Sequence, residues 1–351
     1  ITHEELKKAS YVLKDNKAIG HDSLSSEMIQ CLLEANSDIV LKLFNCILKY
    51  NSHIGKWLTS ILNPIHKSGD KSDTTNYRGI AVMSCFAKLF YSVLNLRLTD
   101  YVLEKKILNE RQLGFIKGNR TTDAHIILHS LIQKYCFMKG SRLYSCFVDF
   151  SKAFDTIPRG LLFKKLANYG IKGNFFNILK NMYINDSICI KVDNKLTNCF
   201  RVNQGVRQGC VLSPLLFNLF LADLPEFLLS PTCQPAKLND QKPLGCLVWA
   251  DDLILLSESD EGLQNMLYNL GSYASINKLR INSDKTKSII FNKTGRLIRS
   301  AYKLADTFIH TTNSYKYLGF LLTPAGGILH GLGDLKDRAL RAYYKLKTTV
   351  D

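Results

Sequence analysis

The chain has 351 residues, which is room for about two domains. Hydrophobic residues make up 46% of it and charged residues 22%, a composition that argues against a disordered chain. The 46 Lys and Arg against 30 Asp and Glu give a net charge of +16, which predicts a polyanionic partner, either nucleic acid or an anionic membrane surface. Charge alone leaves a basic but otherwise ordinary enzyme equally open.

Three features of the sequence indicate where the protein is located in the cell. The longest apolar stretch, residues 210–224, is interrupted by polar residues and is too short to span a bilayer. The chain begins at Ile1 with no signal peptide and no initiator Met, which predicts that it is part of a larger protein. No C-x-x-C pair occurs among the 10 Cys, which argues against a zinc ribbon. Five cysteines in apolar runs are predicted to be reduced, mostly buried thiols of a nuclear or cytosolic protein: Cys31, Cys46, Cys85, Cys136 and Cys146.

The first 142 residues predict helices around two strands. Apolar residues recur with helical spacing in four segments: 2–13, which opens with a capping box, 39–47, 86–101 and 124–135. The apolar segments 57–65 and 77–82 predict strands on either side of the polar loop 66–73.

From Leu143 onward, short strands are mixed with helices. Strands are predicted at 143–150, 188–192, 199–202, 244–249, 253–257, 288–292 and 316–321. Helices are predicted at 161–185 with a break near Gly170 and Gly173, at 211–224, at 263–276 and from 334 onward. The turn residues 193–195 predict a β-hairpin, and 225–243, with four prolines, predicts a loop.

Acidic residues stand where apolar strands end. Asp149 closes one predicted strand, and Asp251 and Asp252 occupy a tight turn between two others. Asp favours turns, so an ordinary hairpin is the more common explanation of the isolated pair. A carboxylate buried among apolar neighbours is costly unless it is paired or binds a metal. Three converging carboxylates would suit Mg²⁺, and two such ions about 3.5–4 Å apart can promote phosphoryl transfer.

Seven short segments match sequence motifs, and each match alone is weak evidence for a protein family. In chain order they are 63–70 with 76–80, 112–115 with 121–124, 149–155, 208–214, 250–252, 282–287 and 317–319. In this order and spacing the chain resembles the reverse transcriptase domain of LINE-type (non-LTR) retrotransposons. The resemblance implies an α/β right-hand polymerase fold with an antiparallel palm sheet packed on helices. It implies fingers with an N-terminal helical extension at 1–142, a palm with inserted helices at 143–292, and the end of the palm, the primer grip and a truncated thumb at 293–351.

The resemblance also implies the metal ligands. Asp149 and Asp251 would be the principal ligands of two Mg²⁺ ions, with Mn²⁺ as an alternative metal. Asp252 would be the third catalytic acid, and the backbone carbonyl of Phe150 would complete the shell of one ion.

Five further residues are implied to bind the incoming dNTP. Lys67 and Arg78 would grip its triphosphate, since a guanidinium fork and an ammonium both suit phosphate; the alternative for each is an ordinary solvated base. Phe154 would be a steric gate against the 2′-OH, or else a buried core Phe. Gln208 and Gly209 would contact the nucleotide, with Gly allowing close backbone approach.

Lys285 resembles the lysine suggested to protonate the leaving pyrophosphate, with Lys287 as its rival. Tyr317, Leu318 and Gly319 resemble the segment that grips the primer end, and an ordinary surface hairpin is the alternative.

The chain departs from the family pattern in two places. Trp249 replaces the usual Tyr or Phe before the acidic turn, which changes the fit of the primer end. Gly79 replaces a common Pro after Arg78, which is expected to loosen a fingers turn.

The sequence therefore predicts an RNA-directed DNA polymerase that adds dNTPs to a primer 3′-OH. Its expected partners are an RNA template, a DNA primer and dNTPs, with no membrane, and other domains of the parent protein lie outside this chain. If the resemblance holds, copying is target-primed in the nucleus, after passage through the cytoplasm as a ribonucleoprotein. One alternative is a group II intron maturase-like enzyme or an RNA-dependent RNA polymerase, and Phe154 argues against ribonucleotide use. Another is a non-catalytic RNA-binding domain that retains the fold.

Overall fold

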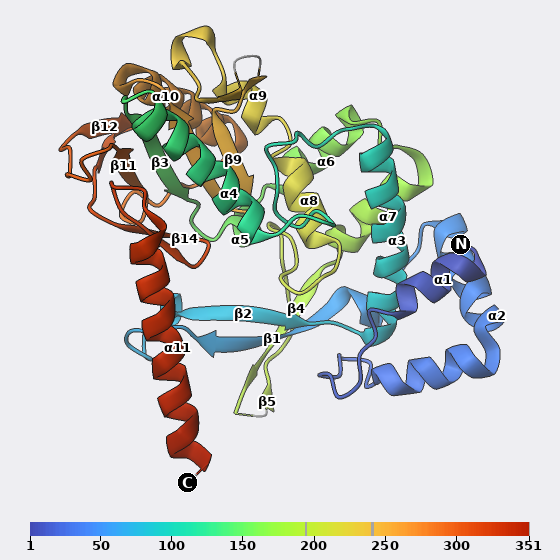
Figure 1. Ribbon diagram of the computed structural model, residues 1–351. Coiled ribbons are helices and arrows are strands. Elements are labelled where there is room, and N and C mark those ends of the chain that lie inside the picture. The colour runs from blue at the N-terminus through green and yellow to red at the C-terminus, as the bar shows by residue number, and fades with distance from the viewer. Residues whose placement is uncertain (194, 240–241, 351) are drawn as a thin grey trace. The chain divides into compact units, whose positions relative to one another are not determined.

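The computed structural model describes residues 1–193, 195–239 and 242–350 (Figure 1). The chain folds into two compact units. The first unit comprises 1–108 and 152–221, and the second comprises 109–151 and 222–351. The units thus alternate along the chain, whereas the predicted fingers, palm and thumb are consecutive; that functional division stays a prediction.

The first unit contains most of the helices of the N-terminal half. They are α1 (His3–Ser10), α2 (Ser26–Tyr50), α3 (Cys85–Glu104), α5 (Ala153–Thr156), α6 (Arg159–Asn168), α7 (Gly173–Ile184) and α8 (Ser213–Phe220). The predicted capping box is confirmed, because Thr2 and Glu5 exchange side-chain and backbone hydrogen bonds at the start of α1. The core of the unit is aromatic, with Phe44 packed against Trp57 and Phe90 at ring distances of 6.1 and 5.0 Å.

A sheet in the order β2-β1-β4-β5, with β6 also on β4, crosses the first unit. Its strands are β1 (Thr59–His66), β2 (Tyr77–Val82), β4 (Ser187–Val192), β5 (Lys195–Leu196) and β6 (Phe200–Arg201). Figure 1 shows β1 and β2 as a long antiparallel pair. The predicted hairpin after β4 is confirmed by the pairing of Val192 with Lys195, while its turn residue Asn194 lies outside the described residues.

The cysteine prediction is partly wrong. Cys85, Cys136 and Cys146 are buried thiols, but Cys31 and Cys46 are exposed because they lie on the outer side of α2. A disulfide that the sequence did not predict joins Cys189 to Cys199 across the β4 hairpin.

The second unit is built on an antiparallel sheet in the order β11-β3-β10-β9. Its strands are β3 (Leu143–Asp149), β9 (Cys246–Trp249), β10 (Asp252–Ser257) and β11 (Lys287–Phe291). Two helices accompany this sheet, α4 (Thr121–Ile132), continued by a π-helical turn at Gln133–Met138, and α10 (Asp260–Asn277). The predicted antiparallel sheet packed on helices is confirmed.

One face of this sheet packs against α4 in a continuous apolar core. Leu128 and Leu131 of α4 are fully buried in a cluster with Leu143 and Phe147 of β3 and Ile254 of β10. Each such buried side chain stabilises the fold by about 1.5–3 kcal/mol. Side chains alternate between the two faces of a strand, so the strand ends next to this core are rigidly placed.

The C-terminal part of the second unit consists of hairpins and a long helix. The remaining elements are α9 (Leu224–Leu228), β7 (Lys237–Asn239), β8 (Lys242–Pro243), β12 (Ala301–Leu304), β13 (Thr307–His310), β14 (Tyr315–Tyr317), β15 (Phe320–Leu322) and α11 (Ile328–Val350). The predicted strand 316–321 is wrong, since a two-residue turn at Leu318 and Gly319 splits it into a hairpin. Both turn residues have positive φ, 43° and 84°, as a type I′ turn requires.

Other sequence predictions fail at the boundaries of elements. The helix predicted over 211–224 ends at Phe220, and the predicted loop 225–243 contains α9 and two short strands, with residues 240–241 outside the described part. Gly79 lies inside β2, paired with Pro64, and not in a turn. Across the described residues, no helix has the length and apolar character needed to cross a membrane.

Candidate active site

Two of the predicted catalytic acids face each other across neighbouring strands. Asp149 at the end of β3 is the direct cross-strand partner of Asp252 at the start of β10. Both belong to the alternating series that includes Phe147 and Ile254, so they lie on the sheet face that packs against α4. Cβ atoms of direct cross-strand partners are about 4.5–5.5 Å apart, and like charges in that position repel.

The third acid, Asp251, lies in the turn that joins β9 to β10. Ala250, before it, has φ +55°. The turn is held from outside by the segment 111–114, because Leu113 N donates to Val248 O at 2.8 Å and Val248 N donates to Arg111 O at 2.9 Å. A Cβ on Gly114 would lie 2.4 Å from the backbone nitrogen of Ala250. Only glycine therefore allows this segment to lie against the acidic turn.

Gly114→Ala is expected to lower primer-extension kcat by about 10–100-fold, since relieving the clash with Ala250 shifts the acidic turn, and a misplacement of about 1 Å misaligns the reacting groups. The measurement is steady-state primer extension on an RNA template. The matched control is Gly271→Ala in α10, where the nearest atoms to the new Cβ are 3.8 Å away and a small gain in helix stability is expected. Unchanged kcat in Gly114→Ala would refute this role of the glycine.

Asp149 is fixed by the segment that precedes β11. Its backbone nitrogen donates to Thr286 Oγ1 at 3.2 Å, and its carbonyl accepts from the backbone nitrogen of Asn282 at 2.8 Å. Lys285 reaches back from the same segment, with Nζ 3.9 Å from Asp149 Oδ2. Its rival Lys287 is in β11, in register with Phe147.

The neighbouring acids alter the protonation of Asp252. Burial, together with the charges of Asp251 and Asp149, raises the pKa of Asp252 to about 6. Burial and the charges of Asp252 and Asp149 also raise the pKa of Tyr315, to about 12. The three carboxylates therefore form one electrostatically coupled group with excess negative charge.

The acidic side chains suit a Mg²⁺ ion that takes only part of its coordination shell from the protein. No group of three or more His, Cys, Asp or Glu side chains in the described part of the chain is arranged to hold a metal ion. Asp149 and Asp252 nevertheless present two facing carboxylates. Mg²⁺ is usually bound by one or two carboxylates together with waters and substrate phosphates. The mutual repulsion that raises the pKa of Asp252 is what such an ion would relieve.

The predicted primer-gripping segment lies on the same side of the sheet as the acids. Tyr315 of β14 stacks on Phe147 of β3 at a ring distance of 4.6 Å, and Tyr317 lies 5.7 Å from the same ring. Burial and the charge of Asp252 raise the pKa of Tyr317. Leu318 and Gly319 form the hairpin turn. Tyr317 is therefore an anchor in the core, and the turn carries the accessible backbone.

Trp249 belongs to the edge of this site. It is half-buried against the α4 core and is the Cα partner of Asp252 in the β9–β10 pairing. The larger ring is thus accommodated next to the acidic turn.

In the first unit, Gln208 and Gly209 lie between β2 and α5. The Gln208 side chain donates to Asp155 Oδ1 at 2.6 Å, and its carbonyl accepts from the backbone nitrogen of Ala81 at 3.1 Å. Gly209 has φ +107°, and a Cβ there would lie 2.6 Å from Ala81 O. The loop therefore depends on glycine for its close approach to β2.

Phe154, in the short helix α5, is half-buried. Its ring stacks on Phe217 of α8 with centroids 4.6 Å apart and planes 14° from parallel. Its carbonyl accepts from the backbone nitrogen of Val206, which ties α5 to the loop that carries Gln208. The ring is thus held in one orientation with part of its surface open.

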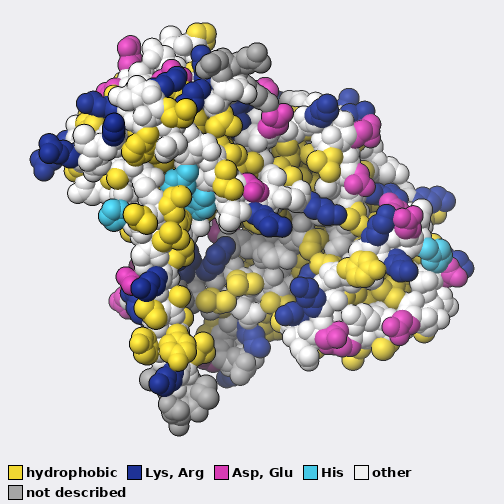
Figure 2. Space-filling model, viewed as in Figure 1, with side chains coloured by type: hydrophobic (Ala, Val, Ile, Leu, Met, Phe, Trp, Pro, Cys, Tyr) yellow, Lys and Arg dark blue, Asp and Glu magenta, His cyan; other side chains and the backbone are white. Residues whose placement is uncertain are grey.

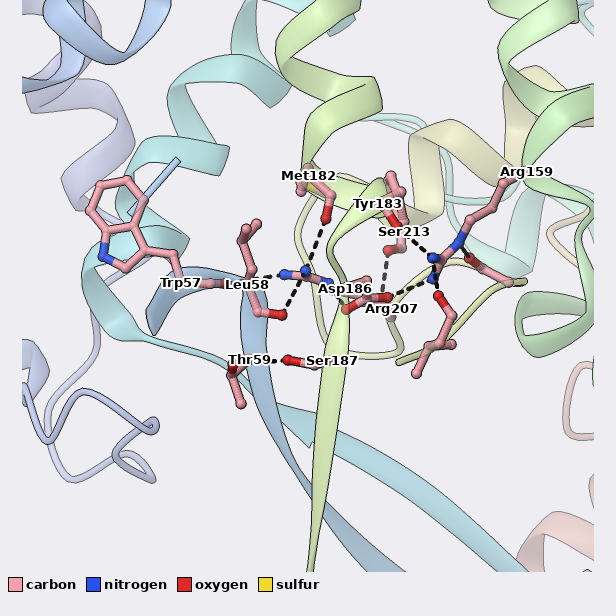
Figure 3. Close-up of polar contacts among 12 residues, drawn as sticks. Trp57, Leu58, Thr59, Arg159, Met182, Tyr183, Asp186, Ser187, Arg207 and Ser213 are labelled. Carbon is pink, nitrogen blue, oxygen red and sulfur yellow. Dashed lines mark hydrogen bonds and ion pairs between the residues drawn. The ribbon is translucent and has the colours of Figure 1, made fainter. Parts of the chain in front are cut away.

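A buried ion-pair network fixes the base of this loop (Figure 3). Asp186 bridges Arg207 and Arg159, with N–O distances of 2.7 and 2.5 Å. Arg207 also donates to three backbone carbonyls from two separate segments, those of Trp57 and Leu58 before β1 and that of Met182 in α7. Arg207 and Asp186 are 4% and 1% exposed, so both charges are compensated entirely inside the protein. This network could not be predicted from the sequence, because an Arg in a Gly-rich loop is typical of a solvated surface.

Arg78 lies in β2, and Lys67 directly follows the end of β1, where its backbone nitrogen donates to Asn76 O at 2.9 Å. Arg78 is opposite Ile65, and Lys67 follows Ile65 by two residues, so both side chains project from one face. Both are exposed, as a phosphate-gripping pair would need to be.

The predicted site residues therefore form two groups, one in each unit. Asp149, Phe150, Asp251, Asp252, Lys285 and Tyr317–Gly319 belong to the second unit, and Lys67, Arg78, Phe154, Gln208 and Gly209 belong to the first. Phe150 is buried, bridging Ile281 through its backbone.

Solved structures with this architecture place the chain in a class. The fold resembles apo telomerase from Candida tropicalis, with a TM-score of 0.54 and 13% identity over 83% of this chain and 53% of that one. A version truncated from the C-terminal domain gives a TM-score of 0.51 and 16% identity over 81% and 58%. With the antiparallel sheet and its strand-end acids, this confirms the predicted right-hand polymerase fold.

The family model described as "Reverse transcriptase (RNA-dependent DNA polymerase)" matches residues 65–322. The chain belongs to this family, as predicted.

Curated relatives narrow the resemblance to non-LTR retrotransposons, as predicted. The probable RNA-directed DNA polymerase from transposon BS of Drosophila melanogaster is 27% identical over 91% of this chain and 35% of its own length. The mobile element jockey polymerase of the same organism is 26% identical over 92% and 35%. The Pol polyprotein from its type-2 element R2DM is 26% identical over 93% and 31%. The chain spans about a third of the length of these relatives.

Proposed function

We propose that this chain copies RNA into DNA by transferring dNMP units to a primer 3′-OH with two Mg²⁺ ions, and that Mn²⁺ can replace them. The observation that carries the proposal is the facing of Asp149 and Asp252 at the end of a rigid sheet, with Asp251 in the adjoining turn. The excess negative charge of this group supports a divalent cation as its ligand.

The chain's own groups would divide the work. Asp149, Asp251 and the carbonyl of Phe150 would hold the ions, with Asp252 as the third acid. When bound, the ions would supply activation of the attacking hydroxyl and neutralisation of the leaving oxygen. Lys285, which lies beside Asp149 and is exposed, would deliver a proton to the pyrophosphate that leaves.

The first unit would select the nucleotide. Lys67 and Arg78 would bind the triphosphate as a point charge and a planar fork. Gln208 and Gly209 would contact the nucleotide from the loop that Arg207 holds. The partly open ring of Phe154 would exclude the 2′-OH of a ribonucleotide.

The primer and template would bind by shape and charge. The turn at Leu318–Gly319, anchored by Tyr317, would hold the primer end. The net charge of +16 supports contact with a nucleic-acid backbone, and affinity should fall steeply with salt. We further propose that the chain copies the element's own RNA by target priming in the nucleus, after passage through the cytoplasm as a ribonucleoprotein and together with further domains of the parent protein. The relatives' names support its origin in a transposable element.

Asp149→Ala tests the function directly. The unaltered chain is expected to extend a DNA primer on a poly-ribonucleotide template with dNTPs, and Asp149→Ala to lose extension by about three orders of magnitude with template binding retained. A non-catalytic RNA-binding domain would bind the template equally in both forms and extend nothing. Incorporation that survives the substitution would reject the site.

Phe154→Ala tests substrate choice. Removing the ring is expected to raise rNTP incorporation relative to dNTP by about 10–100-fold, since steric exclusion of one hydroxyl is worth that much. Phe200→Ala, at a 49% exposed position on β6, is the control and should leave the ratio unchanged. An unchanged ratio in Phe154→Ala would contradict the assignment of Phe154 as the gate, whereas a preference for rNTPs in the unaltered chain would favour a ribonucleotide-using enzyme.

A further inference from the structure

In the first unit, the loop that precedes α8 lies directly against the short helix α5. Gly205 N donates to Ile157 O at 2.8 Å. The next residue, Val206, donates its backbone N–H to Phe154 O, also at 2.8 Å. Gly205 has φ +77°, and a Cβ there would lie 2.5 Å from the backbone oxygen of Asp155. Only glycine allows this close contact, so the loop and the helix are fixed against each other through their backbones.

A side-chain hydrogen bond completes this contact. Gln208 Nε2 donates to Asp155 Oδ1 at 2.6 Å. An ionised carboxylate can only accept hydrogen bonds, whereas a glutamine amide has a donating end and an accepting end. Asp155 therefore selects the end of the Gln208 amide that faces it, and the amide oxygen is directed away from the carboxylate.

The charge of Asp155 is unfavourable for the proposed ligand. Asp155 is exposed and contacts a loop that would bind a nucleoside triphosphate, which is a polyanion. The chain has 46 Lys and Arg against 30 Asp and Glu, and Figure 2 shows Lys and Arg side chains spread over the visible face. A carboxylate next to the phosphates lowers the affinity for dNTP by repulsion, unless its hydrogen bond to Gln208 raises the affinity by more.

We propose that Asp155 is a positioning residue for dNTP binding, because it holds the amide of Gln208 in one orientation. The inference rests on the proposed function, in which Gln208 contacts the nucleotide. Asp155 itself does not need to touch the nucleotide or the metal ions. Without Asp155, the Gln208 amide would rotate freely in the unbound protein, and ordering it when dNTP binds would cost affinity.

This role can be separated from stability and from the choice of sugar. The backbone hydrogen bonds of the loop and the buried contacts of Arg207 do not involve the side chain of Asp155. Phe154 is held by its ring stack on Phe217 and by the hydrogen bond from Val206. Removal of the Asp155 carboxylate is therefore expected to leave the urea midpoint and the ratio of rNTP to dNTP incorporation unchanged.

The test measures primer extension on an RNA template with varied dNTP and, separately, with varied primer–template. Asp155→Ala is expected to raise KM for dNTP about fivefold, the effect of one hydrogen bond, with KM for primer–template unchanged. Asp155→Asn keeps an accepting oxygen but can also turn its amide nitrogen toward Gln208, so its KM for dNTP should lie between those of Asp155→Ala and the unaltered chain. Asp100→Ala, at an exposed aspartate of α3, is the control and should leave KM for dNTP unchanged.

A double variant shows whether Asp155 acts through Gln208. Gln208→Ala alone is expected to raise KM for dNTP at least as much as Asp155→Ala. Because Asp155 would then have no amide to hold, adding Asp155→Ala to Gln208→Ala should cause no further rise. Losses that add fully in the double variant would overturn the inference.

The sign of the change separates positioning from charge repulsion. A lowered KM for dNTP in both Asp155→Ala and Asp155→Asn would show that the acid acts only by repulsion and would overturn the inference. An unchanged KM for dNTP in Asp155→Ala, even with a lower kcat, would also overturn it. Should Asp155→Ala fail to fold, Asp155→Asn decides by its own KM for dNTP. Absence of extension by the unaltered chain would instead overturn the proposed function.

Discussion

Asp252→Asn is expected to abolish primer extension and, at the same time, to stabilise the metal-free protein at neutral pH. Activity should fall by about three orders of magnitude or more, because the site loses one of its two facing carboxylates. In EDTA at pH 7.5 the free energy of unfolding should rise by about 1–3 kcal/mol, because a half-buried charge that Asp149 and Asp251 repel is removed.

The pH dependence of this effect has a defined sign. The folded pKa of Asp252, about 6, lies above its ordinary value of 3.8, so the native state binds the proton more tightly than the unfolded state. The stabilising contribution of the protonated carboxyl is present below pH 3.8 and is lost as pH rises through 6. The unfolding curves of the two forms in EDTA should therefore converge at acid pH and separate above pH 6.

The effect of added Mg²⁺ on thermal stability complements the unfolding measurements in EDTA. The thermal midpoint of the unaltered chain should rise with Mg²⁺ at pH 7.5 and respond less below pH 6, where Asp252 holds a proton. Asp252→Asn should respond weakly at both values. Asp306→Asn, in the exposed turn of the β12–β13 hairpin, is the control. Equal stability of Asp252→Asn and the unaltered chain in EDTA at pH 7.5 would contradict the coupling of the acids.

Asp186→Asn is expected to destabilise the protein by about 3–5 kcal/mol, the largest stability effect that the structure predicts. The substitution keeps the shape of the side chain but leaves the buried guanidinium of Arg207 without its counter-charge. The measurement is urea-induced unfolding, and the surviving folded protein should also show a higher KM for dNTP, because the loop with Gln208 is released.

Asp38→Asn is the matched control for a surface ion pair. Asp38 pairs with His3 at 3.0 Å, but both side chains are more than half exposed, and its loss should change stability by less than about 1 kcal/mol. A similar small change in Asp186→Asn would show that the network does not stabilise the loop.

The palm-like sheet and its acids could be predicted from the sequence because polar residues interrupt apolar runs there. Asp149 and Asp251 are visible as charges at the ends of strands whose neighbours are all apolar. The order of the motifs then supplied the class of fold. The prediction of one strand at 316–321 was wrong because the usual turn residues are missing there. Leu318 precedes Gly319 in a type I′ turn that normally has Asn or Asp in that position.

Partners distant in the chain could not be predicted. The approach of Gly114 to Ala250 joins residues more than a hundred positions apart, and a glycine before an aromatic residue has no distinctive pattern. Arg207 looks like a surface base until Asp186 is seen beside it. The disulfide of Cys189 and Cys199 depends on a strand pairing, and cysteine connectivity cannot be deduced from sequence.

The way in which Arg207 is bound has a consequence for how this region can evolve. Apart from Asp186, its partners at Trp57, Leu58 and Met182 are peptide carbonyls, which every amino acid provides. Substitutions at those three positions keep the backbone carbonyls that accept the hydrogen bonds. Lysine at 207, in contrast, lacks the planar guanidinium that donates to all of these carbonyls at once. Related chains should therefore vary at the contacted positions and still keep the guanidinium paired with its acid.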